Sequence, residues 1–130
     1  MMNSERFAYD TAYEPPAPVV QILLSNPVDP SQQTQIWGLV DTGADITVVP
    51  ETLVSHLQLI RQGDIQVGGF DGVYRLHPVF LVDIQIGQIR FDLVEVIAAA
   101  TNELILGRNV LNQLDLRLNG PHLVLEIFNA

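Results

Sequence analysis

The sequence predicts a single all-β, barrel-like domain with one or two short helices. Many short runs rich in β-branched and aromatic residues alternate with turns of Gly, Pro, Asn and Asp, the pattern of barrels and sandwiches. The chain has 130 residues, of which 48% are hydrophobic. It is therefore long and apolar enough to bury one core, and we expect one folded domain.

Each expected element follows from local pattern. A short helix is predicted where the period changes, because Pro50 and Glu51 suit a first helical turn and Leu53, Val54 and Leu57 share one face. In chain order, the sequence predicts strands at 19–25, 34–40 and 46–49, the helix at 50–59, a hairpin at 65–82 with its tip at 68–72, a hairpin from 84 to 98, a strand at 103–106, a helix at 109–114, and strands at 116–119 and 123–128.

The second hairpin has a predicted register. Gly87 opens a two-residue turn of type II′, which places Ile84 opposite Phe91 and leaves one face of the ribbon apolar. The same register sets Asp83 opposite Asp92. Like charges directly opposite each other are unfavourable, so we expect the hairpin to twist apart or bulge there.

The first 18 residues are mixed, polar and end in Glu14-Pro15-Pro16-Ala17-Pro18. Proline lacks the amide proton that a sheet needs and favours extended, solvated chain. We therefore expect a flexible arm over residues 1–18 and the folded domain over residues 19–130. The arm is a disordered end, a propeptide-like tail or a partner-binding segment.

Composition excludes several kinds of function. The net charge is −9, with six Lys and Arg residues in total, so a phosphate backbone would be repelled and no nucleic acid partner is expected. There is no cysteine, and the isolated His56, His77 and His122 do not form a metal cluster by spacing, so no metal or cofactor is expected. No signal peptide or membrane-spanning run is evident, which makes the cytoplasm the expected compartment.

The candidate chemistry lies in Leu39-Val40-Asp41-Thr42-Gly43-Ala44-Asp45, a tight polar turn between two apolar strands. A carboxylate at the end of a buried strand is costly unless it has a partner. One interpretation is an Asx-type turn, in which Asp41 bonds backbone amides two residues on.

Three stretches together resemble the single-domain aspartic proteases of the retropepsin type. The first is Asp41-Thr42-Gly43-Ala44, which resembles the active-site loop. Residues 67–73 (VGGFDGV) resemble the glycine-rich flap, and residues 104–111 (LILGRNVL) resemble the strand, Gly-Arg-Asn turn and helix near the family's C-terminus. They occur in the family's order, and the resemblance covers about residues 19–118. It implies a closed acid-protease barrel with a flap hairpin.

The resemblance implies an aspartic endopeptidase that hydrolyses polypeptide substrates as a homodimer. Two close carboxylates share one proton and activate a water, one as base and one as acid. Because this chain has one Asp-Thr-Gly loop, Asp41 of each subunit would meet at the dimer axis. The implied catalytic residues are Asp41, Thr42, whose hydroxyl braces the loop across the axis, and Gly43. With Ala44 supplying no hydrogen-bond donor, we expect activity nearer neutral pH than in pepsin-like enzymes.

The resemblance also assigns a substrate cleft. Asp45 would contact substrate backbone and pair with Arg108, which then has a structural role; the alternative for Arg108 is an exposed residue at a helix start. The flap would supply backbone amides and an apolar lid, and apolar walls would favour apolar side chains beside the cleaved bond. The implied substrate-binding residues are Ala44, Asp45, Val67, Gly68, Gly69, Phe70, Ile105 and Leu106, with Val49 and Val73 as further walls.

The chain departs from the viral pattern at three places. It has the helix at 50–59, as retropepsin-like domains of the DNA-damage-inducible type and some bacterial relatives do. Asp71 places a charge at the flap tip, and an extra hairpin follows residue 114. Its last strand, 123–128, either joins an intersubunit sheet or closes the monomer's own barrel. Two rival functions stay open: a non-catalytic dimerisation or peptide-binding module, and a processing domain that acts only within or after release from a precursor.

Overall fold

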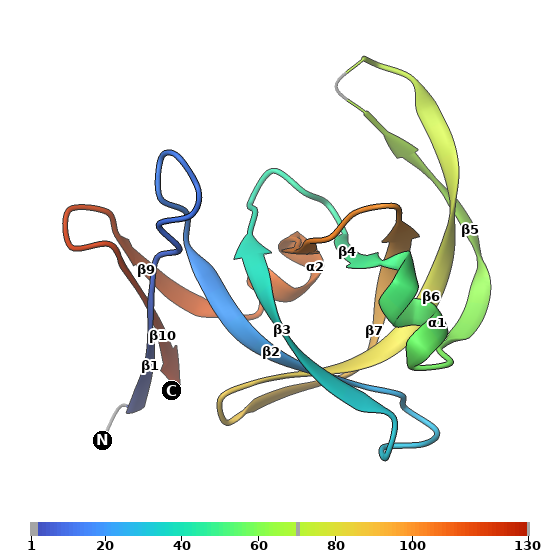
Figure 1. Cartoon of the computed structure of the whole chain (residues 1–130), viewed down its shortest axis with the longest axis horizontal. Helices are drawn as coiled ribbons and strands as arrows, with labels where there is room; N and C mark the ends of the chain where they lie inside the picture. Colours follow the sequence, from blue (N-terminus) through green and yellow to red (C-terminus); the bar gives the residue numbers. More distant parts are fainter. Residues whose placement is uncertain (1–2, 70, 130) are drawn as a thin grey trace.

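The computed structural model describes residues 3–69 and 71–129 (Figure 1). Over these residues the chain forms ten strands and two short helices. In order they are β1 (Asn3–Ala8), β2 (Val19–Ser25), β3 (Gln33–Val40), β4 (Thr47–Pro50), α1 (Glu51–His56), β5 (Ile60–Gly68), β6 (Tyr74–Ile86), β7 (Ile89–Ala99), β8 (Leu104–Leu106), α2 (Arg108–Leu111), β9 (Asp115–Asn119) and β10 (Val124–Asn129).

Six strands close into a barrel. The larger sheet has the order β2-β3-β8-β4-β7-β6-β5, and β2 also pairs with β6 through Leu24 and Ile84. That extra pairing closes β2, β3, β8, β4, β7 and β6 into a ring and leaves β5 outside it. The predicted all-β closed barrel with two short helices is therefore confirmed.

Alternate residues of β2 and of the end of β6 fill the barrel interior. On β2, Val20, Ile22 and Leu24 are 0–1% exposed, and on β6 Ile84 and Ile86 are fully buried. Burying each such side chain contributes about 1.5–3 kcal/mol relative to leaving it in water. The same alternation fixes the register, since a slip of one residue would turn these side chains outward.

The β6–β7 hairpin has the predicted register, with Ile84 opposite Phe91. Gly87 adopts a φ of +58°, which the II′ turn requires and which glycine tolerates. The register shifts at Asp83, so the bulge expected from two facing aspartates is present. Arg90 lies between the two acids, 3.2 Å from Asp83 Oδ2 and 2.9 Å from Asp92 Oδ1, and offsets their repulsion.

Strands β5 and β6 form a long hairpin that we call the flap. It begins at Ile60, five residues before the predicted start, and its strands pair up to Gly68 and Tyr74. Figure 1 shows the flap rising from the barrel and curving over one end of it. Strand β5 and the residues around the flap tip are almost all exposed and lack the packing that holds the barrel, whereas the second half of β6 is a barrel strand.

The two ends of the chain form a second sheet, of order β1-β10-β9. Its inner face packs on the barrel, where Leu125 and Ile127 are fully buried. The sequence left two roles open for the last strand. In this structure β10 lies between β9 and β1 of its own chain and takes no part in the barrel ring.

The expectation of solvated chain over residues 1–18 needs correction. Strand β1 pairs with β10 over six positions, and Phe7 packs edge-on against Trp37 with ring centroids 6.2 Å apart. This strand has no clear signal in the sequence. Ser4 and Arg6 are exposed, and Phe7 is the one large apolar residue among residues 4–8. The domain boundary at residue 18 stays a prediction.

Neither α1 nor α2, the two helices of the described residues, is long and apolar enough to cross a lipid bilayer.

Candidate active site

The Asp41 turn lies where two parallel strands end. Strands β3 and β8 pair in parallel, Val40 beside Leu106, and the amide of Asp41 donates to the Leu106 carbonyl at 3.1 Å. The carboxyl ends of parallel strands meet at one edge of a sheet. The turn after β3 is therefore held against the Gly107-Arg108 turn after β8, although 66 positions separate Thr42 from Arg108.

Asp41 is half-buried and forms the Asx turn that the sequence left as an alternative. Its Oδ1 accepts the Gly43 amide at 2.9 Å, and its carbonyl accepts the Ala44 amide at 3.2 Å. Within the described residues Oδ2 accepts no hydrogen bond. The turn and a catalytic role are compatible, because one carboxylate oxygen is enough to position the side chain, and Asp41 borders the cleft.

Arg108 clamps the outside of this turn. Its amide donates to the Ala44 carbonyl at 2.8 Å and its Nη1 to the Thr42 carbonyl at 2.7 Å, while Nη2 pairs with Asp45 Oδ1. The expected Asp45–Arg108 ion pair is present. It is not bidentate, because the two guanidinium nitrogens contact different acceptors. The Asp45 side chain is 84% exposed, so the pair contributes more to geometry than to stability.

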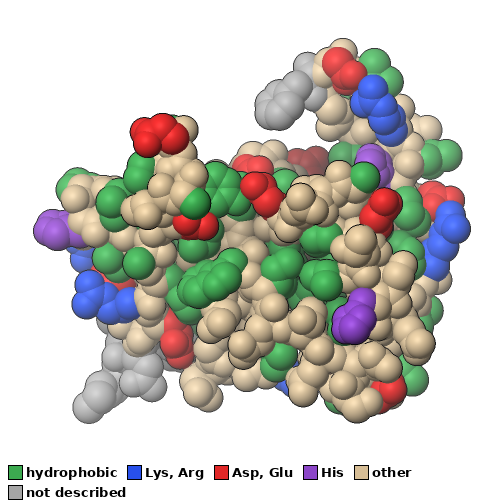
Figure 2. Space-filling model, in the orientation of Figure 1, with side chains coloured by type: hydrophobic (Ala, Val, Ile, Leu, Met, Phe, Trp, Pro, Cys, Tyr) green, Lys and Arg blue, Asp and Glu red, His purple; other side chains and the backbone are tan. Residues whose placement is uncertain are grey.

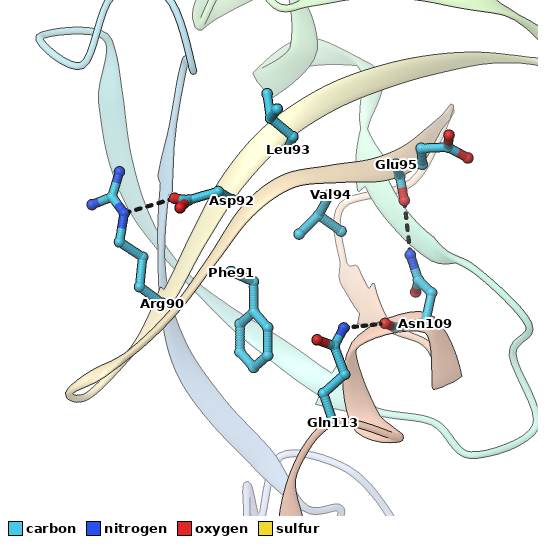
Figure 3. Close-up of a pocket in the computed structure, with 8 residues that line it drawn as sticks. All are labelled: Arg90, Phe91, Asp92, Leu93, Val94, Glu95, Asn109 and Gln113. Carbon is cyan, nitrogen blue, oxygen red and sulfur yellow. Dashed lines mark hydrogen bonds and ion pairs between the residues drawn. The ribbon is translucent and has the colours of Figure 1, made fainter.

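Behind the turn lies a hydrogen-bond network that sequence reasoning missed. The buried Thr47 hydroxyl donates to Asn109 Oδ1 at 2.9 Å and accepts the Gly107 amide at 3.1 Å. The Asn109 amide group then donates to the Glu95 carbonyl on β7 at 2.9 Å (Figure 3). Gln113 donates to the Asn109 carbonyl beside a second hollow, of about 470 Å³, between β7 and α2. The Gly-Arg-Asn turn was the one signal for this network in the sequence.

Gly107 is required by close approach. A Cβ at this position would stand 2.6 Å from the carbonyl carbon of Ile46, which is backbone and cannot move aside. A side chain is therefore excluded, and the absence of one lets the β8–α2 turn lie directly against the start of β4.

A cleft of about 390 Å³ lies between the Asp41 turn and the flap. Figure 2 shows the flap projecting beyond the body over a hollowed surface. Of the predicted site residues, the structure brings together at this cleft Asp41, Gly43, Ala44, Asp45, Val67, Gly68 and Gly69. Three apolar residues that the sequence did not single out complete it, namely Ile46, Val48 and Ile97.

Other predicted site residues lie elsewhere. Thr42 is exposed and does not line the cleft. Leu106 is fully buried in the barrel core, and half-buried Ile105 pairs with Val48, which takes the cleft position instead. The period-2 alternation accounts for Leu106, since only one face of a strand can border the cleft.

The two further walls that the sequence predicted do not line the cleft either. Val49 is buried in the core, and Val73 is 49% exposed near the flap tip. The proposed lid, Phe70, lies outside the described residues. The described residues contain no group of three or more His, Asp or Glu side chains placed to hold a metal ion.

The flap tip carries a braced carboxylate. Asp71 Oδ1 accepts the Val73 amide at 3.0 Å, and Oδ2 pairs with Arg75 Nη2 at 3.1 Å. The amide of Val73 first, and the Arg75 guanidinium second, hold the pKa of Asp71 below its ordinary value. The charged form of Asp71 therefore stabilises the turn.

Comparison with known proteins identifies the fold and family. Residues 32–113 match the family described as "gag-polyprotein putative aspartyl protease". No curated protein sequence matches the chain significantly.

Three solved structures have a similar fold. A retropepsin-like aspartic protease from Rickettsia conorii has a TM-score of 0.65 at 14% identity, covering 100% of this chain and 95% of that one. EIAV protease complexed with the inhibitor HBY-793 has a TM-score of 0.56 at 24% identity, covering 75% and 86%. The foamy viral protease-reverse transcriptase, in complex with an RNA/DNA hybrid, has a TM-score of 0.54 at 20% identity, covering 73% of this chain and 12% of that one.

The matched family spans well over half of the chain and includes the Asp41 turn, the flap and the Gly107-Arg108 turn. The chain therefore belongs to the retropepsin-like aspartyl protease family.

Proposed function

We propose that this protein is an aspartic endopeptidase that hydrolyses peptide bonds in polypeptides as a homodimer. The observation that carries the proposal is the position of Asp41, at the floor of a cleft roofed by the flap with one carboxylate oxygen unengaged by the described residues. A cleft of this form admits an extended chain and shields it from bulk water.

One carboxylate does not complete the chemistry. The other acid at the cleft is Asp45, which Arg108 holds on the far side of the same turn. Asp41 therefore needs an acid from outside its own chain. A two-fold axis beside the cleft would bring a second Asp41 and complete the pair.

The proposed reaction uses the two Asp41 carboxylates in different protonation states. Two close carboxylates cannot both ionise readily, so they share one proton. The ionised one takes a proton from a water as that water attacks the carbonyl carbon of the substrate. The protonated one supports the carbonyl oxygen, and a proton passes to the leaving amine as the C–N bond breaks. Neither a metal nor a covalent enzyme intermediate is needed.

The cleft walls support a substrate preference. Ile46, Val48, Val67 and Ile97 are apolar, so apolar side chains beside the cleaved bond should bind best. The side chain of Ala44 carries no hydrogen-bond donor for the Asp41 carboxylate. The ionised pair is therefore less stabilised than in pepsin-like enzymes, and we propose an activity optimum nearer neutral pH.

Cleavage of a mixed peptide library tests the proposal, with the wild-type protein, Asp41→Asn and the matched control Asp115→Asn. Asp115 is an exposed acid on β9, so its substitution makes the same charge change away from the cleft. We expect cleavage by wild type and Asp115→Asn, blocked by pepstatin, and none by Asp41→Asn. If wild type and Asp41→Asn behave alike, the enzyme proposal fails. Peptide binding without cleavage would instead support the rival, a binding module of the same fold.

A further inference from the structure

Arg75 lies on the face of the flap that covers the cleft. It stands directly opposite Val67 in the β5–β6 register, and directly opposed residues project from the same face of a sheet. Val67 and Gly69 line the cleft. Arg75 Nη1 lies 3.5 Å from where a Cβ on Gly69 would stand, so the guanidinium borders the roof of the cleft.

The Arg75 guanidinium is held in place and still has donors to offer. Its Nη2 pairs with Asp71, whose other oxygen is fixed by the Val73 amide. Within the described residues, Nε and Nη1 of Arg75 contact no acceptor. The side chain is 59% exposed, so a carboxylate can reach it. An anchored guanidinium loses less side-chain entropy on binding a carboxylate than a freely rotating one does.

The charge distribution makes this guanidinium distinctive at the cleft. The chain has six Arg and no Lys, against 15 acidic residues. Of the other five arginines, Arg108 is engaged at the Asp41 turn, and Arg6, Arg61 and Arg90 form ion pairs on other surfaces. Arg117 lies on β9, in the second sheet. Figure 2 shows basic and acidic side chains together at the end of the flap, above the hollow. The roof of the cleft thus carries a guanidinium, partly offset by Asp71, above a floor that contains Asp41.

We propose that Arg75 is a specificity-determining residue that selects substrates with an acidic side chain at one position beneath the flap tip. A glutamate or aspartate there would accept hydrogen bonds from Nε and Nη1 while Asp71 keeps Nη2. This inference rests on the proposed protease function. Because the site is partly exposed and Asp71 weakens its field, we expect a preference of about three- to tenfold rather than absolute selection.

The test uses peptides that the wild-type protein cleaves, in pairs that differ by Glu or Gln at one position, scanned over the residues beside the cleaved bond. The quantity measured is the ratio of kcat/KM for the Glu and Gln peptides. We expect one position at which wild type prefers Glu, with the preference falling as salt is added. Arg75→Gln should bring that ratio close to one. The matched control Arg61→Gln removes an equally exposed, ion-paired arginine from the same hairpin and should keep the preference.

The outcomes separate the two proposals. The ratio of kcat/KM for the Glu and Gln peptides is taken within each variant, so a general change of activity in Arg75→Gln cancels from it. The Arg75 proposal is overturned if wild type shows no Glu preference at any position, or if Arg75→Gln retains it. If wild type cleaves none of the peptides, the protease proposal itself fails and the Arg75 proposal falls with it.

Discussion

The side-chain oxygen of Asn109 accepts both the hydroxyl and the backbone amide of Thr47, at 2.9 and 3.0 Å. Thr47 is fully buried and begins β4 directly after the Asp41 turn, while Asn109 lies in α2. These two hydrogen bonds therefore hold the start of β4, just after the Asp41 turn, against helix α2, 62 positions later in the chain.

Replacement of Asn109 by alanine should destabilise the protein. Two buried donors of Thr47 would lose their acceptor, so the free energy of unfolding should fall by about 2–4 kcal/mol. Urea denaturation at one fixed protein concentration measures it. Asn109→Asp keeps the acceptor oxygen for Thr47 but loses the exposed hydrogen bond to the Glu95 carbonyl. The free energy of unfolding should therefore fall by about 1 kcal/mol. A loss for Asn109→Ala no larger than that of the exposed control Asn112→Ala would contradict this account.

Alanine at Gly107 should be poorly tolerated. Its Cβ would stand 2.6 Å from the Ile46 carbonyl carbon, so the β8–α2 turn would have to move away from β4. We expect a loss of about 1–3 kcal/mol, seen as a lower Tm in thermal unfolding. Gly120→Ala is the matched control, because no atom lies within 4 Å of its added Cβ. Equal Tm values for the two variants would show that the close approach is unimportant.

Substitution of Arg108 by lysine should reduce activity more than stability. One ammonium cannot reproduce the separate contacts of the guanidinium with Thr42 and Asp45, so the Asp41 turn loses its clamp. Since the ion pair is largely exposed, Tm should change little, while kcat/KM should fall about tenfold or more. Arg117→Lys on β9 controls for the substitution itself. A kcat/KM for Arg108→Lys equal to that of wild type would show that Arg108 does not support the active-site turn and is only an exposed residue at a helix start.

The flap tip should depend on pH through Asp71. Its pKa is lowered, first by the Val73 amide and second by Arg75. Stabilisation from a lowered pKa is present above the ordinary value and is lost as pH falls through the lowered one. Titration of the Asp71 carboxyl carbon by NMR should give a midpoint below the ordinary value. Arg75→Gln should raise that midpoint part of the way, since the Val73 amide stays, and Arg61→Gln should leave it unchanged. A midpoint for Asp71 in Arg75→Gln equal to that of the wild-type protein would refute the ion pair between Asp71 and Arg75.

Local pattern predicted most of the fold, because the barrel strands are rich in apolar and β-branched residues and the turns between them contain Gly, Pro, Asn or Asp. The β6–β7 hairpin shows how far this reaches: Gly87 set the register, and the register exposed the clash between Asp83 and Asp92 that the bulge resolves. Strand β1 escaped prediction because its stability comes from pairing with β10, more than a hundred residues later, and not from its own composition.

The candidate site was predicted where neighbours in sequence are neighbours in space. The Asp41 turn and the paired positions Val67 to Gly69 are of this kind. Ile97 comes to the cleft through the pairing of β7 with β4, and its residue type gives no local signal. Leu106 was misplaced for the related reason that its strand is buried on the side it faces.

The central claim is that Asp41 acts only beside a second Asp41. The direct measurement adds Asp41→Asn protein to a fixed amount of wild type, well above the dimer dissociation constant, and follows cleavage of one peptide. Random pairing should lower activity to about half at equal amounts and to about a tenth at tenfold excess, whereas the same mass of serum albumin should have no effect. Activity that stays constant as Asp41→Asn is added would show that each chain works alone and would contradict the account.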